Sequence, residues 1–460
     1  MRARSGEPPR TMVQKILAPR ADDPTLAGES VEVKVDQVAV TRSLEPYLRE
    51  AGLGASQRAR VEVAVLHAGV AVTGKAAGVD PDPTSITRAR AVGVSVARPG
   101  AGFAGPVHLE RFASPARLCV SDSPRLSLTG GAGMLSVLAT PRQIGQALAR
   151  GTCTLRTPRS VHVLLSGRLR PFVGPRDVVL ELCRRGLGDL VRDVGERVGA
   201  PIVLEVGGPS ARLLSVGERA IIATVCSRIG ALAVLFGGDE RTEVFLRDQR
   251  RSKAHRSLAP DPGARYEEAV TVDLGAIDPL AVDEAGAIRP VRDLAGRPVS
   301  QVVLGGDGVT LRDMMTASTL LKAKKVPSGV EWLVAVPSRQ MLEVLAADGA
   351  LAELVATGAR IIEPDERVLS GALYPPTSEG ASVRTFDADP RDAGAVRASV
   401  EAAAFAVAHG KIGDPRAFKR PTRVTVPREL PTEDVLIVRD RDPATAHRRP
   451  AREASRISRE

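Results

Sequence analysis

The stretch QVVLGGDGVTLRDMMTASTLLKAKK (residues 301–325) joins a short apolar run to a helix-like pattern through a glycine-rich turn. The same order recurs along the chain, with further apolar runs at VHVLLSG (161–167), PIVLEVG (201–207) and EWLVAVPS (331–338). Short Val- and Leu-rich runs that alternate with helices are typical of parallel strands buried in βαβ units. The sequence therefore predicts an α/β protein with doubly wound layers.

The length and the composition bound the class of protein. The chain has 460 residues, of which 43% are hydrophobic and only 3% aromatic. This length exceeds what one hydrophobic core usually supports, so several domains with aliphatic cores are predicted. The N-terminal segment MRARSGEPPR lacks the apolar part of a secretory signal, and no stretch is apolar for long enough to span a bilayer. We therefore expect a cytoplasmic protein without a membrane segment.

The formal net charge of +10 raises the question of nucleic-acid binding, because clustered Lys and Arg release counterions from phosphates. The basic residues are mostly Arg interleaved with Asp and Glu, and no aromatic platform or known binding motif accompanies them. Nucleic acid is therefore not expected as the partner. The four cysteines form no Cys-x-x-Cys motif and are predicted to be buried, reduced thiols: Cys119, Cys153, Cys183 and Cys226.

Nine strings of the sequence carry a resemblance to a known family. They are TMVQKILA (11–18), VDQVAVT (35–41), RPGAGFAGPVHLERF (98–112), SDSPRLSLTGGAGML (121–135), LSGRLRPFVGPRDVVLELCRRG (165–186), YEEAVTVDLGAIDPLAV (266–282), LRDMMTASTLLKAKKV (311–326), SRQMLEVLAADGALAELVATGARI (338–361) and AAAFAVAHGKIGDPR (402–416). In this order they resemble the large α/β/α region of the aconitase and 3-isopropylmalate dehydratase large-subunit family. The resemblance runs almost from end to end.

The resemblance implies a division of the chain into domains. Three α/β/α domains are expected at residues 1–165, 166–290 and 291–415, followed by a connector remnant and charged tail at 416–460. In the family a fourth, swivelling domain closes the site, either on the same chain or as a separate subunit. We expect this chain to lack that domain. The basic C-terminal tail is expected to be disordered, because it is too polar to bury a core.

In this family three cysteines hold a 4Fe–4S cluster, because thiolates match iron and leave one iron open for substrate. The resemblance places Gly306, Glu366 and Leu369 at the three cysteine positions. Neither glycine nor leucine carries an atom that binds iron. The resemblance therefore implies a member without the cluster, and no other cofactor is expected.

Most other substrate and catalytic positions of the family hold different residues in this chain. In chain order they are Thr41-Arg42, Leu66, Gly105, Pro106, Pro124, Thr224, Arg228 and the segment Asp387-Ala388-Asp389-Pro390. The last replaces a loop in which an arginine fork holds a substrate carboxylate. The retained positions, and so the candidate catalytic residues, are Asp122, Ser123 and His67. The alternative interpretation is structural: Asp122 and Ser123 cap a helix, and His67 and His108 are core histidines.

Elimination of water from a hydroxy acid requires a Lewis acid at the leaving hydroxyl and a base at the neighbouring carbon. The resemblance places neither group here. We therefore expect a non-catalytic binding or regulatory relative of the hydro-lyases. Its expected partners are an active family subunit and a small carboxylic acid.

Three alternatives remain open. The first is a hydro-lyase or isomerase for a di- or tricarboxylic hydroxy acid, of the aconitate hydratase or 3-isopropylmalate dehydratase type, with another metal or a separate small swivel-domain subunit. Hard oxygen donors for such a metal are Asp307, Asp365 and Glu366, with Asp387 and Asp389 as further acids. The second is a small-anion site at the glycine-rich turns 129–133 and 305–308, which precede helix-like segments. The third is an RNA-binding aconitase-like protein.

Overall fold

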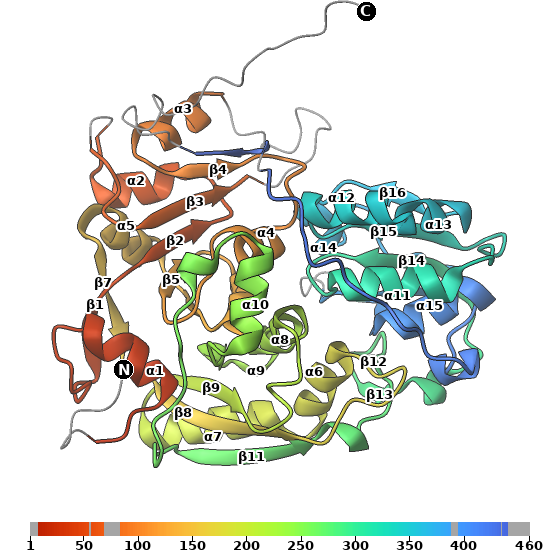
Figure 1. Cartoon of the computed structure of the whole chain (residues 1–460), viewed down its shortest axis with the longest axis horizontal. Helices are drawn as coiled ribbons and strands as arrows, with labels where there is room; N and C mark the ends of the chain where they lie inside the picture. Colours follow the sequence, from red (N-terminus) through yellow and green to blue (C-terminus); the bar gives the residue numbers. More distant parts are fainter. Residues whose placement is uncertain (1–7, 55–56, 69–82, 388–393, 434, 440–460) are drawn as a thin grey trace, which may run out of the picture.

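The computed structural model describes residues 8–54, 57–68, 83–387, 394–433 and 435–439. Within these residues the strands form sheets of six, four and seven strands and one two-stranded ribbon. Figure 1 shows the three larger sheets arranged around the centre of the molecule with helices against them. Most strand pairs in these sheets are parallel, as Val- and Leu-rich runs between helices require. The predicted α/β class is confirmed.

The first sheet has the strand order β19-β4-β3-β2-β5-β6, and only the short strand β19 is antiparallel to its neighbour. Its strands β2 and β5 are buried along their whole length. The N-terminal helix, the two-stranded ribbon β1-β7, four further α-helices and the 3-10 helix η2 belong to the same part of the chain. The bounds are α1 Met12–Leu17, β1 Ser30–Lys34, β2 Gln37–Val40, α2 Glu45–Ala51, β3 Val63–His67, α3 Pro83–Ala91, β4 Ser95–Ala97, α4 Ala104–Arg111, β5 Leu118–Ser121, the 3-10 helix η2 Pro124–Ala132, β6 Leu135–Leu138, α5 Pro141–Arg150, β7 Thr152–Arg156 and β19 Ile437–Val438.

The second sheet has the order β10-β9-β8-β11, and all its strands are parallel. The bounds are β8 Arg159–Ser166, α6 Pro175–Arg184, α7 Leu187–Val198, β9 Ile202–Gly207, α8 Val216–Ala223, α9 Cys226–Ile229, β10 Ala233–Phe236, α10 Glu240–Asp248 and β11 Glu268–Asp273. Helix α8 lies directly on η2 of the first part. An added Cβ on Gly131 would lie 2.3 Å from the backbone nitrogen of Ala220, so glycine is required for this close approach.

The third sheet has the order β13-β12-β18-β17-β14-β15-β16. Its elements are β12 Leu280–Val282, β13 Ile288–Pro290, β14 Val299–Gly305, α11 Leu311–Leu321, β15 Glu331–Ala335, α12 Arg339–Asp348, α13 Ala350–Ala356, β16 Arg360–Ile362, α14 Glu366–Leu369, β17 Ala381–Arg384, β18 Ala395–Ala398 and α15 Val400–His409. The stretch 301–325 thus forms most of β14, a turn and α11. Helix α11 begins after Thr310, whose hydroxyl accepts from the backbone N–H of Asp313 while the Asp313 carboxylate accepts from the backbone N–H of Thr310.

Two features of the sheets differ from the predicted domain limits. Strand β8 runs across the limit at 165–166. Strands β12 and β13, which were placed in the second domain, pair within the third sheet. The division into domains stays a prediction. Most of the predicted tail, residues 440–460, lies outside the described residues.

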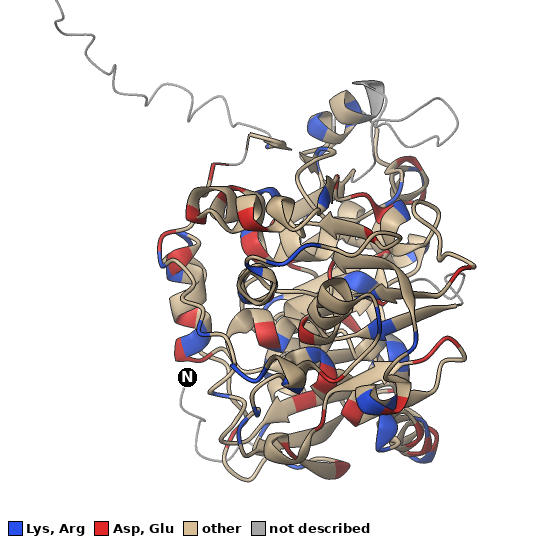
Figure 2. Ribbon diagram, turned by 90° about the vertical axis from the view of Figure 1, so that its right-hand side faces the viewer, with Lys and Arg blue, Asp and Glu red and all other residues tan. Residues whose placement is uncertain are grey.

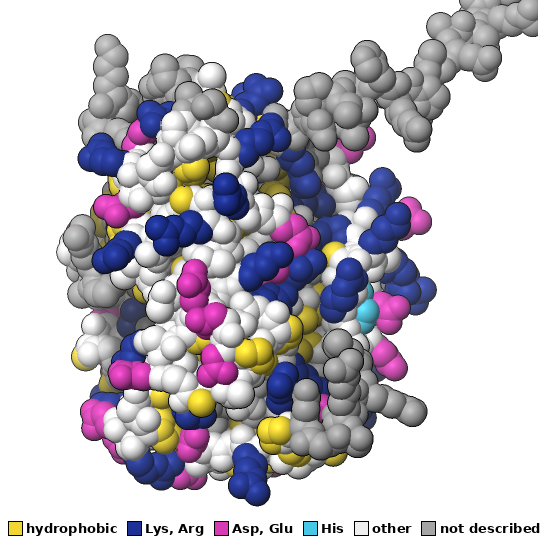
Figure 3. All heavy atoms as spheres, turned by 90° about the vertical axis from the view of Figure 1, so that its left-hand side faces the viewer, with side chains coloured by type: hydrophobic (Ala, Val, Ile, Leu, Met, Phe, Trp, Pro, Cys, Tyr) yellow, Lys and Arg dark blue, Asp and Glu magenta, His cyan; other side chains and the backbone are white. Residues whose placement is uncertain are grey.

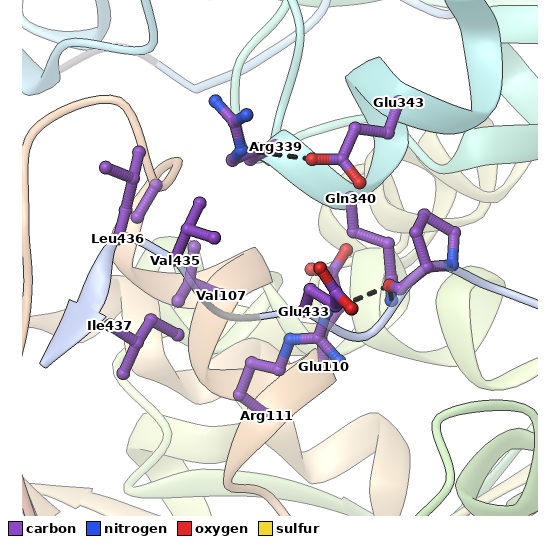
Figure 4. A pocket seen from close by; sticks show the side chains of 12 residues that line it. Val107, Glu110, Arg111, Arg339, Gln340, Glu343, Glu433, Val435, Leu436 and Ile437 are labelled. Atoms are coloured by element: carbon purple, nitrogen blue, oxygen red, sulfur yellow. Dashed lines mark hydrogen bonds and ion pairs between the residues drawn. The ribbon is translucent and has the colours of Figure 1, made fainter. Parts of the chain in front are cut away.

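The C-terminal segment crosses the molecule from α15 to the first sheet (Figure 1), where β19 pairs with β4. Figure 4 shows how it is held: Val107 of α4 lies beside Leu436 and Ile437, with which it forms a small apolar cluster. The Gln340 side chain of α12 donates to the backbone oxygen of Pro431 at 2.6 Å. This segment, predicted as a connector remnant, therefore ties α12 to the first sheet.

The surface carries acidic and basic side chains side by side. Figure 2 shows Lys and Arg interspersed with Asp and Glu along the ribbon, and Figure 3 shows the same mixture on another face. Among the described residues, no helix combines the length and the apolar character needed to cross a membrane. The four cysteines are free thiols, and three of them are buried as predicted, whereas Cys183 is half-buried.

Candidate functional site

A cavity of about 480 Å³ lies between elements of all three sheets. Its walls include segments that follow the carboxyl ends of parallel strands: Arg42 follows β2, Asp122 follows β5, Asp307 follows β14 and Asp387 follows β17. Crevices at the carboxyl ends of strands are where α/β proteins bind ligands. The cavity walls also bring together five arginines, which are Arg42, Arg125, Arg176, Arg228 and Arg397.

The structure gives Asp122 a complete set of donors. Its carboxylate accepts from the backbone N–H and the hydroxyl of Thr41 at 2.8 and 3.1 Å, from the backbone N–H of Arg42 at 3.1 Å and from the hydroxyl of Tyr47 at 2.8 Å. Burial, together with the Asp122 charge, raises the pKa of Tyr47, so this hydroxyl keeps its proton. These contacts tie Asp122 to the segment between β2 and α2, which is a structural role different from the helix cap that the sequence suggested.

Ser123 also lies at the cavity wall, and it caps η2. Its hydroxyl accepts from the backbone N–H of Arg125 at 3.3 Å. This is the helix-capping role that the sequence left open. A catalytic role for Asp122 or Ser123 stays a prediction.

His67 lies apart from the cavity walls. It is buried at the end of β3, and its Nε2 lies 3.1 Å from Nδ1 of His108, whose Nε2 lies 3.0 Å from Oε1 of Gln37. Burial lowers the pKa of His67 to about 3, so the ring stays neutral. The structure thus places the two histidines in one core chain of hydrogen bonds and does not bring His67 to Asp122 and Ser123.

The three positions that correspond to cluster cysteines do converge. A Cβ on Gly306 would lie 2.8 Å from Cδ2 of Leu369 and 2.8 Å from Cδ1 of Phe386, and both of these side chains are fully buried. They belong to an apolar cluster that includes Val303. Glu366 stands beside them: its carboxylate lies 3.4 Å from the backbone nitrogen of Ala104. Hydrocarbon fills the space beside Gly306, and none of these three residues carries a thiol, so they do not fit an iron–sulfur cluster, which needs thiolates.

Two arginines and one aspartate form an ion-pair group in the cavity wall. Arg176 of α6 donates to Oδ1 of Asp387 at 2.5 Å, and Arg228 of α9 donates through Nε to Oδ2 at 2.8 Å and through Nη2 to Oδ1. Burial alone would raise the pKa of Asp387, but the two guanidinium groups outweigh it and hold this pKa far below its usual value. Asp387 is therefore ionised throughout the physiological range.

A second ion pair lies next to it. Arg125 donates through Nη1 to Oδ2 of Asp307 at 2.7 Å and through Nη2 to the backbone oxygen of Asp387 at 3.0 Å. Its Nε lies 3.9 Å from the carboxylate of Glu366. Arg125 thus lies between the cavity and Glu366, and it joins η2 to the third sheet.

The comparisons with known proteins give the family. The family model of the aconitase family (aconitate hydratase) matches residues 85–290. The chain is 28% identical over 427 residues to the 3-isopropylmalate dehydratase large subunit 2 of Archaeoglobus fulgidus, covering 89% of this chain and 99% of the relative. It is 30% identical over 367 residues to the homoaconitase large subunit of Thermus thermophilus, covering 77% and 83%. The chain belongs to the aconitase and 3-isopropylmalate dehydratase large-subunit family. This confirms the resemblance.

For this aconitase-family chain, each acid of the predicted hard-metal site has other partners. Asp307 pairs with Arg125, and Asp365 caps α14 and pairs with Arg367 at 2.7 Å. In the part of the chain that the structure describes, no three His, Cys, Asp or Glu side chains gather closely enough to hold a metal. Asp389 lies outside the described residues. The metal site stays a prediction.

Sequence reasoning did not single out Arg125 and Arg176. Both follow a proline and stand in the first turn of η2 and α6, where the helix dipole disfavours a cation. A basic residue at such a position indicates that an acidic side chain from elsewhere in the protein neutralises its charge. That charge comes from Asp307 and Asp387, which lie far away in the sequence of this aconitase-family protein.

Proposed function

We propose that this aconitase-family chain carries no iron–sulfur cluster and does not dehydrate hydroxy acids, but binds a small carboxylic acid in its cleft and acts as a binding or regulatory partner of an active family subunit. The residues at the three positions of the cluster cysteines are the main support for this proposal. At the three positions of the cluster cysteines stand Gly306, Glu366 and Leu369, and the first and last pack against Phe386.

The charges of the cleft suit binding better than elimination of water. Its walls hold five arginines and three aspartates. Arginine stays protonated and presents a planar fork to carboxylates, but it cannot take a proton from a substrate carbon. The aspartates are engaged by guanidinium or backbone donors. Loss of one electrophilic contact typically costs about a hundredfold in rate, and this cleft differs from the family at several such positions.

Anaerobic reconstitution with iron and sulfide tests the proposal. We expect substoichiometric iron and sulfide after desalting, and no turnover of citrate, homocitrate or 3-isopropylmalate. A protein with a known 4Fe–4S cluster, treated in parallel, serves as the positive control for reconstitution. Calorimetric titration of the unreconstituted chain with citrate should show binding. A stoichiometric cluster with turnover contradicts the proposal, and so does an absence of binding to any di- or tricarboxylate.

A second candidate is a large subunit of a hydro-lyase that works with a separate small subunit and a different metal. The names of the relatives favour it, because 3-isopropylmalate dehydratase and homoaconitase large subunits align with this chain over most of their length. Thermal shift with citrate in the presence of Mg²⁺, Mn²⁺ or EDTA separates the two candidates. Stabilisation that requires the metal supports the hydro-lyase, and stabilisation that EDTA leaves unchanged supports the metal-free binding protein.

A further inference from the structure

Arg176 and Arg228 share a single carboxylate. Both guanidinium groups donate to Asp387, and all three side chains line the same cavity. Arg176 is 3% exposed and is therefore buried. The side chains of Arg228 and Asp387 are 19% and 20% exposed and therefore remain accessible from the cavity.

The three residues come from two different parts of the fold. The arginines lie on α6 and α9, which cover the second sheet, whereas Asp387 follows β17 of the third sheet. Two fixed guanidinium groups around one carboxylate are the arrangement by which proteins grip the carboxylate of a ligand. Here the carboxylate belongs to the protein itself: it is that of Asp387, on the opposite wall of the cavity.

We propose that Arg176 and Arg228 form a carboxylate-binding subsite, and that Asp387 occupies this subsite as an internal carboxylate which a ligand must displace. The inference rests on the proposed function in that it takes the cleft to be a small-acid site. It adds the two residues that hold the acid and the residue that competes with it.

Charge and space favour an exchange of this kind. Removing Asp387 without replacement would leave two guanidinium groups with an uncompensated charge in a largely buried place, which is strongly unfavourable. An incoming carboxylate restores the neutralisation that Asp387 provides. The cavity of about 480 Å³ leaves space for the body of a small acid, and Arg42, which also lines it, adds a positive charge for a second carboxylate. The ligand class is therefore a di- or tricarboxylate.

The test compares Asp387→Asn with the wild-type chain by calorimetric titration of citrate at fixed ionic strength. The amide keeps the shape of the side chain and removes its charge. We expect Asp387→Asn to bind citrate about tenfold or more tightly than wild type, and Arg228→Gln to abolish binding in both backgrounds. Arg184→Gln is the matched control, because Arg184 lies on α6, is 52% exposed and pairs with Glu181 outside the cavity. It should leave the affinity unchanged.

The outcomes separate this inference from the proposed function. If wild type binds no acid and Asp387→Asn does, the proposed function fails, but the inference that Asp387 occupies a carboxylate-binding subsite is supported. If wild type binds citrate and Asp387→Asn binds it no more tightly, the subsite inference fails alone, and the ion-pair group is a structural tie between the two walls. If neither binds, both fail.

A second measurement covers the case in which Asp387→Asn does not fold. In wild type, saturating citrate should increase hydrogen exchange in peptides that contain β17 and end at Asp387, because the side-chain anchor is released. Exchange that stays unchanged, or slows, overturns the inference without the variant.

Discussion

Substitution of Gly306 by alanine tests whether Leu369 and Phe386 fill the space at this position, which corresponds to a cluster cysteine of the family. Gly306 has φ +68°, a left-handed conformation that costs an alanine about 1–2 kcal/mol. The new Cβ would also lie 2.8 Å from Leu369 and from Phe386, and overpacking of a core typically costs about 1–3 kcal/mol. We therefore expect Gly306→Ala to lower the free energy of unfolding by about 2–5 kcal/mol.

Gly230 offers a matched control. It has φ +69°, and no atom lies within 4 Å of an added Cβ, so Gly230→Ala carries the backbone cost of about 1–2 kcal/mol alone. The effect of alanine on the unfolded chain is the same at both positions and cancels in the comparison. The difference between the two variants, about 1–3 kcal/mol, is the packing cost at Gly306.

Urea unfolding monitored by tryptophan fluorescence measures these changes. Trp332 is the single tryptophan of the sequence, and it is buried in β15, next to β14 in the third sheet. Gly306→Ala combined with Leu369→Ala should lose less stability than the sum of the two single variants, because the shortened side chain makes room for the new Cβ. An equal loss for Gly306→Ala and Gly230→Ala would refute the reasoning, since it would show that the position is not packed.

Three further predictions concern stability. Asp122→Ala leaves the donors of the β2–α2 segment without their acceptor, so the free energy of unfolding should fall by about 1–3 kcal/mol. Urea unfolding measures this change, and an unchanged value would contradict the structural role of Asp122. Burial raises the pKa of Asp177 to about 7, of Asp313 to about 6 and of Glu401 to about 8. These carboxyl groups hold protons more tightly in the folded than in the unfolded chain, so stability should decrease as the pH rises from about 4 to about 8, and Asp177→Asn should flatten this slope. Burial lowers the pKa of His67 to about 3, so the folded chain binds fewer protons here, and below about pH 6.5 the contribution of His67 opposes that of the carboxyl groups. His67→Gln should therefore steepen the loss of stability as the pH rises from about 4 to about 6.5, and a slope equal to that of wild type would contradict this.

The sequence by itself determined the class of fold and the family. The pattern of residues 301–325 predicts a strand, a turn and a helix because local apolar periodicity depends only on neighbouring residues, and β14 and α11 lie there. The identities at positions 306, 366 and 369 could also be read directly, because glycine and leucine lack iron-binding atoms wherever they lie.

Only the tertiary structure decided how the polar residues of the cleft are used. Arg176 and Arg228 lie 211 and 159 residues before Asp387, and no local pattern brings them together. Asp122 is retained in the sequence, yet its lone pairs are taken by Thr41, Arg42 and Tyr47, which only the fold places around it. The position of His67 away from the cavity depends in the same way on its contact with His108 of α4, which lies 41 residues further along the chain. The sequence gives the chemical type of the residue at each position. Which residues it contacts depends on how distant segments pack in the folded protein.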